Sequence, residues 1–195
     1  MFAALAGVAA GLVHVVFGPD HLAAVAPLAA SRARQPWRTG LQWGLGHTAG
    51  VLLVGLLLTA FRAVLPIEAI SQYSERIVGI ALLGLGVWGV GRARSARVHS
   101  HTSTRASFLM GALHGVAGSS HLFGVLPALA FPSQTAALWY LAGFGAGAIL
   151  AMTVFAAVIG TIALGASRRG VDVHRGMLYA CSACAFLVGG FWLVV

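Results

Sequence analysis

The chain has 195 residues, of which 59% are hydrophobic and only 8% are charged, and its mean hydropathy is +0.91. A soluble domain carries roughly a quarter charged residues, so this composition excludes an ordinary water-soluble globule. A membrane-spanning helix needs about 20 apolar residues, and six such helices with short connections use nearly the whole length. We therefore expect one all-α transmembrane domain over residues 1–195, without enzymatic activity.

The formal net charge of +8 would suggest a nucleic-acid partner in a soluble protein. Here all twelve basic residues are arginines, and they lie mainly between apolar runs. Arginines in short loops beside a membrane are a signal of topology. We expect no nucleic-acid partner.

Six transmembrane spans are predicted, with short connections between them. Their expected limits are 3–31, 38–61, 76–92, 106–131, 136–165 and 176–195. The first span lacks the basic region with which a secretory signal begins, so we read it as a permanent span. The two cysteines of the last span are too few for a disulfide framework.

The arginines alternate between the two sides of the predicted membrane. Ten of the twelve fall in the first, third and fifth connections: Arg32, Arg34, Arg38, Arg92, Arg94, Arg97, Arg105, Arg168, Arg169 and Arg175. The second connection balances Arg62 and Arg76 with two glutamates, and the fourth has no charge. By the positive-inside rule, both termini should lie outside the cytoplasm.

The chain contains an internal repeat. Residues 11–30 align with residues 111–130, and nine of these twenty positions are identical, including two histidines and a proline. The repeats are expected at 1–98 and 101–195. Because each holds three spans, the second would enter the membrane from the opposite side, as in inverted-repeat secondary transporters. The alternative is an old duplication in which one half is now only structural.

The first span is expected to break at Gly18-Pro19. A straight helix over residues 3–31 would be about 43 Å long, against a hydrocarbon core of about 30 Å. Proline lacks an amide hydrogen and clashes with the preceding turn, which should free carbonyls near Val15 and Val16. Gly118 predicts a corresponding break in the fourth span.

The predicted break carries residues that suit a metal ion. His14 and His21 are seven residues apart, and Asp20 lies beside them. Imidazole and carboxylate form a ligand set for first-row divalent metals. A buried aspartate costs roughly 2.5 to 3.5 kcal/mol on the insertion scale, so Asp20 needs a cationic partner.

The second half repeats this spacing with His114 and His121, but Ser120 replaces Asp20. The two halves therefore differ in charge, which favours one cation site over two. The alternative for each histidine is a structural role, with its ring hydrogen-bonded to a nearby carbonyl.

His47, near the middle of the second span, is a further candidate. It is either a ligand, a proton relay or a packing residue, and we align it with Phe144 of the second half. Because neutral histidines bind metal, binding would release protons, which makes coupling to a proton gradient an option.

Cys181 and Cys184 form a CxxC pattern inside the last span. In a soluble thioredoxin-like protein this pattern indicates redox chemistry, whereas within an apolar helix it favours packing. A membrane thiol–disulfide carrier is therefore one alternative function. Export of a small anion of the sulfite type is another, although the buried Asp20 argues against it.

The run from His14 through Asp20 and His21 to Val25 resembles the signature of the nickel/cobalt transporter family, in its short urease-accessory, UreH-like branch. In the better-known nickel permeases four residues separate the first histidine from the Asp-His pair, whereas five do here. The resemblance implies a divalent-metal permease of the bacterial cytoplasmic membrane, with His14, Asp20 and His21 as ligands; His114 and His121 rest on the repeat. Ni²⁺ or Co²⁺ would be cargo, with no permanently bound cofactor. The partners would be the ion and the bilayer, and homo-oligomerisation stays open.

Overall fold

The computed structural model describes residues 2–31, 35–61, 67–95, 104–117 and 124–194, and it is all-helical over these ranges. They hold seven α-helices and one short 3₁₀ helix, with no strand: α1 (Phe2–Phe17), α2 (Pro19–Ala30), α3 (Trp37–Phe61), α4 (Ile67–Arg94), α5 (Thr104–Ala117), η1 (Leu126–Ala130), α7 (Gln134–Arg169) and α8 (Val171–Val194).

The first predicted span is broken at the expected place. Helices α1 and α2 meet at Gly18 with a bend of 74°. Gly18 has an extended backbone, with φ −90° and ψ 94°, and Pro19 opens α2, where its missing N–H would have no helical partner. The Val15 carbonyl is not left open, because it accepts a hydrogen bond from the Gly18 N–H at 3.3 Å. The predicted break at Gly118 lies outside the described residues.

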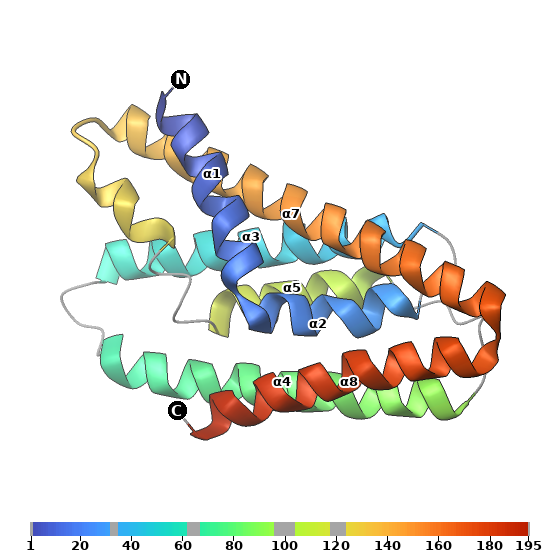
Figure 1. Cartoon of the computed structure of the whole chain (residues 1–195). Coiled ribbons are helices and arrows are strands. Elements are labelled where there is room, and N and C mark those ends of the chain that lie inside the picture. Colours follow the sequence, from blue (N-terminus) through green and yellow to red (C-terminus); the bar gives the residue numbers. More distant parts are fainter. Residues whose placement is uncertain (1, 32–34, 62–66, 96–103, 118–123, 195) are drawn as a thin grey trace.

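The two halves of the chain exchange helices. The first helix of each half lies along the second helix of the other, so α1 packs on α7 and α5 packs on α3. Helices α4 and α8 form a third pair, which runs beneath the others in Figure 1. Helix α2 lies between this pair and the rest, and nearly all its residues after Pro19 are buried.

Glycines let the exchanged helices approach closely. A Cβ on Gly11 would lie 2.1 Å from the Phe144 carbonyl oxygen, and a Cβ on Gly111 would lie 2.1 Å from that of Trp43. Since Gly11 and Gly111 are equivalent in the repeat, Trp43 corresponds to Phe144. The alignment of His47 with Phe144 is therefore wrong, and its counterpart is Ala148.

Several described helices can cross a membrane. Three segments are long and apolar enough, namely Arg76–Arg94, Gln134–Arg169 and Asp172–Val194, and the bent pair of α1 and α2 is a fourth. Large apolar side chains such as Phe17 and Leu187 are more than 70% exposed, whereas His21 and His47 are fully buried. This arrangement, apolar outside and polar within, identifies a membrane protein.

The arginine-rich segments gather at one end of the bundle. In Figure 1, α2, α4 and α7 end there, and α3, α5 and α8 begin there. The terminal turns of these helices carry Arg38, Arg92, Arg94, Arg105, Arg168, Arg169 and Arg175. The folded chain thus keeps the charge segregation that the predicted topology requires.

The glycine contacts can be tested with alanine. Gly11→Ala and Gly111→Ala should each lower the free energy of unfolding by about 1–3 kcal/mol, because the added methyl overlaps a backbone carbonyl. Gly165→Ala is the control, since a Cβ there has nothing within 4 Å, and alanine normally favours a helix over glycine. Thermal unfolding in detergent measures all three. Equal melting temperatures for the two classes would contradict the packing.

Candidate metal centre

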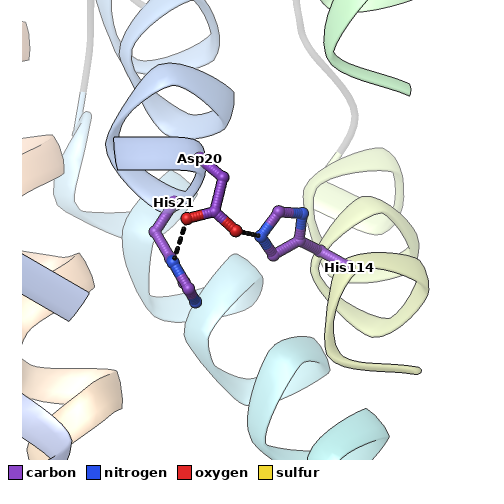
Figure 2. Close-up of polar contacts among 3 residues, drawn as sticks. All are labelled: Asp20, His21 and His114. Carbon is purple, nitrogen blue, oxygen red and sulfur yellow. Dashed lines mark hydrogen bonds and ion pairs between the residues drawn. The ribbon is translucent and has the colours of Figure 1, made fainter. Parts of the chain in front are cut away.

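A buried carboxylate joins the two halves of the chain. Asp20, in the first turn of α2, is 3% exposed. Its Oδ1 lies 3.0 Å from Nδ1 of His21, and its Oδ2 lies 2.9 Å from Nε2 of His114, in the last turn of α5 (Figure 2). The charge also benefits from the N-terminal end of the α2 dipole. Asp20 therefore has the polar partners that a buried carboxylate requires.

Three histidine rings meet beside this pair of contacts. The ring of His21 lies 4.6 Å from that of His14 and 4.8 Å from that of His47, between centroids. One ring nitrogen from each of the three can be chosen so that all lie within 4.8 Å of one another. Two nitrogens bound to one ion at 2.0–2.1 Å are at most about 4.2 Å apart, so small ring movements would close the group around a cation.

A second group of donors shares His21. Asp20, His21 and His114 also present three donor atoms within 4.8 Å of one another, and all three residues are buried. The centroids of His21 and His114 are 4.9 Å apart. Together the two groups form one cluster of five side chains at the break between α1 and α2.

The backbone at the break positions His21. A Cβ on Gly18 would lie 2.2 Å from the His21 Nδ1, so only glycine leaves room for this ring. His14 occupies the last turn of α1, directly before the break. The sharp bend thus brings His14 and His21 together, although they would lie two turns apart on a continuous helix.

Two aromatic rings enclose the cluster. Trp43 stacks on His47, with centroids 5.0 Å apart and an interplanar angle of 14°. The ring centroid of Phe144 lies 5.4 Å from that of His14, and the ring centroid of Trp43 lies 5.2 Å from that of His114. The interplanar angles of these two pairs are 46° and 49°. Sequence reasoning missed both aromatic residues. The spacing of Trp43 and His47, four residues apart on one helical face, was the available signal for Trp43.

The structure describes five of the six predicted site residues. The structure brings together His14, Asp20, His21, His47 and His114. His121 lies outside the described residues. His47 lies against four partners of the cluster, namely His14, His21, Trp43 and His114.

The hydrogen bonds indicate what the rings can do. A carboxylate only accepts hydrogen bonds, so His21 donates from Nδ1 and His114 donates from Nε2. In a neutral imidazole the other nitrogen then carries the lone pair. A carboxylate that orients a histidine in this way is the usual support of a metal ligand.

The hydrogen-bonded role of Asp20 gives a test without any metal. Asp20→Ala should lower the free energy of unfolding by about 1–3 kcal/mol, because two buried imidazole N–H groups lose their acceptor. Asp172→Ala should leave stability unchanged, since its ion pair with Arg175 at 3.7 Å is exposed. Thermal unfolding in a chelating buffer compares the two variants. A harmless Asp20→Ala would show that this bridge contributes nothing to the fold.

Comparison with known proteins finds three curated relatives. The chain is 33% identical to Chloroplast protein FOR GROWTH AND FERTILITY 2 and 32% identical to Chloroplast protein FOR GROWTH AND FERTILITY 1, both of Arabidopsis thaliana, over 94% of its own length. It spans 54% and 56% of those two proteins, about half of each. It is 27% identical to urease accessory protein UreH of Bacillus sp. (strain TB-90), over 88% of this chain and 82% of the relative.

No family profile matches the chain, and no solved structure does. The match to UreH supports the expected resemblance only as a distant relation, since the identities to the two chloroplast proteins are higher. The chain is thus a helical membrane protein that is similar, over most of its length, to a urease accessory protein and to two chloroplast proteins.

Proposed function

We propose that this chain transports a divalent transition-metal cation across a membrane, with nickel as the first choice and cobalt as the second. The observation that carries the proposal is the pair of three-donor groups that share His21, built from α1, α2, α3 and α5 inside an apolar bundle. Such a concentration of histidines around a buried carboxylate is energetically costly in a membrane, and ionisable residues within membrane spans mark functional sites. The resemblance of the His14 to Val25 run to nickel/cobalt transporters selects the cargo.

In this proposal the cation is bound by His14, His21 and His47, with Asp20 and His114 completing or orienting the set. His121 belongs to it by the internal repeat. Neutral imidazoles are preferred by nickel, cobalt and zinc, and a carboxylate supplies a negative charge for the dication. We infer that His47 is a ligand, and not only a proton relay, because its ring is part of the three-histidine group.

We further propose that the chain crosses the membrane six times as two inverted repeats. The exchanged packing of α1 on α7 and of α5 on α3 supports this, as do the reciprocal glycine contacts. A Cβ on Gly79 would lie 2.8 Å from the Gly189 oxygen, and a Cβ on Gly189 would lie 2.9 Å from the Gly79 oxygen. The arginine-rich end would face the cytoplasm of a bacterial cell and both termini the outside.

Metal binding by purified protein tests this function. Nickel should bind to the unmodified chain, and His14→Ala, His21→Ala and His47→Ala should each weaken its affinity by about 10–100-fold or more, the loss typical even for residues that only support a ligand. His174→Ala, in α8, should have no effect. Isothermal titration with nickel, cobalt, zinc and manganese measures the affinities. If His14→Ala/His21→Ala binds these metals as well as the unmodified chain, the proposal fails.

The thiol carrier is the rival that a simple substitution separates. Cys181 and Cys184 are free thiols on α8, and Cys181 packs against an apolar cluster of Ala30, Ala93, Ala163 and Leu178. Cys181→Ser/Cys184→Ser should therefore leave nickel flux into proteoliposomes within about two-fold of the unmodified chain, because neither sulfur belongs to the histidine cluster. Total loss of activity would favour electron transfer instead.

A further inference from the structure

Two cavities lie in series beside the histidine cluster. The inner one, of about 10 Å³, extends to His114 and is bounded by Ala24 of α2 and Ala81 of α4. The outer one, of about 270 Å³, is bounded by Leu28 of α2, Trp88 of α4 and Ala106 of α5. Leu85 and Met110 belong to the walls of both. The cavities therefore meet at these two side chains.

The outer cavity lies toward the arginine-rich end. Its walls come from the last turns of α2, the second half of α4 and the beginning of α5. Ala106 is exposed and directly follows Arg105. His114 lies about two turns further along α5, and its Nε2 contacts Asp20 at 2.9 Å. A line through the two cavities thus joins the exposed beginning of α5 to the buried carboxylate.

We propose that this line is the passage between the metal site and the arginine-rich face, with Leu85 and Met110 as its constriction. The inference rests on the proposed function and adds the route to it. A volume of about 10 Å³ is at the lower limit for one water molecule, whereas 270 Å³ is far larger. The structure therefore represents a form that is closed at the constriction and wide outside it.

The packing of α4 explains how the passage opens. Helix α4 makes its main contact with α8 and much smaller ones with α2 and α5. An outward shift of the α4–α8 pair would widen the gap beside α2 and α5 without separating α4 from α8, although it would also loosen the contacts of α8 with α2 and α7. Sliding or hinging of packed helices is an ordinary form of conformational change in proteins.

Met110 has a chemical role in the passage. It precedes His114 by four residues on α5, so the two side chains lie on the same helical face. Its thioether is flexible and polarisable, and it is the sulfur donor among the described wall residues of the two cavities. A leucine can close the constriction equally well, but it offers no electron pair. Met110 is therefore a transient ligand between the outer cavity and His114.

Alkylation of a single cysteine tests the route. Ala106→Cys, introduced into Cys181→Ser/Cys184→Ser and reacted with a bulky maleimide, should reduce nickel flux into proteoliposomes at least ten-fold, while nickel affinity stays within about two-fold. Leu109→Cys is the matched control, because this neighbour on α5 is 65% exposed and lines neither cavity. Its labelling should change neither quantity.

The outcomes separate the route from the function. Full flux after complete labelling at position 106, with the labelling confirmed by mass spectrometry, would overturn the proposed passage. The outer cavity would then be a site for lipid and not part of the ion route. Absence of both flux and binding in the unmodified chain would overturn the proposed function, and the passage with it.

Met110→Leu should lower the flux several-fold at unchanged affinity, while Met177→Leu, a similarly half-buried methionine on α8, should not. Unchanged flux in Met110→Leu would remove its role as a donor.

Discussion

The buried carboxylate of Asp20 is the constraint on which the rest of the site depends. An isolated charge in an apolar interior is strongly unfavourable, and here both oxygens are bound by imidazoles, one from α2 and one from α5. This arrangement requires a helix to begin at Pro19, so that Asp20 lies in its first turn. It also requires Gly18, because any larger residue would displace the His21 ring. The broken span is thus the condition for the cluster.

Close helix packing provides the second condition. His14 and His114 lie in the last turns of α1 and α5, and these helices are held by backbone contacts at Gly11 and Gly111. Without such glycines the helix axes would separate, as small residues are what allow membrane helices to approach closely. The rings would then lie too far apart for Asp20 to reach both halves. Glycines, which have no side-chain donor atoms, therefore determine how closely the histidine and aspartate donors approach one another.

The sequence was most informative where a local rule decides the structure. The break follows from the length of the first apolar run and from Pro19, and the break in turn brings His14 close to His21. The predicted span 76–92 agrees with the apolar segment Arg76–Arg94, whereas helix α4 itself already begins at Ile67, because the helix also includes the more polar residues that precede the span. Local patterns thus located the broken segment well and the limits of helices less well.

Contacts between helices could not be read in the same way. The repeat has an offset of 100 in the first helices, but the glycine contacts match Trp43 with Phe144, an offset of one more. Offsets of 100 and 101 carry His47 to residues 147 and 148, so its alignment with Phe144 was off by about one helical turn, an error of register. The aromatic walls were missed for the same reason, since which ring of α3 or α7 faces a histidine depends on the helix register. That register is decided by backbone contacts that the sequence pattern does not display.

The described residues combine a nearly symmetric scaffold with asymmetric chemistry. Phe144 contacts His14 much as Trp43 contacts His114, so each half contributes one histidine and one aromatic wall. His47, however, corresponds to Ala148, and Asp20 aligns with Ser120 in the sequence. The first half therefore holds both the negative charge and the additional imidazole. In a permease of this kind, the cation would stay with the donors of the first half, and an outward shift of the α4–α8 pair would open the site toward the arginine-rich end. The asymmetry of the donors would thus fix the position of the ion in a nearly symmetric scaffold.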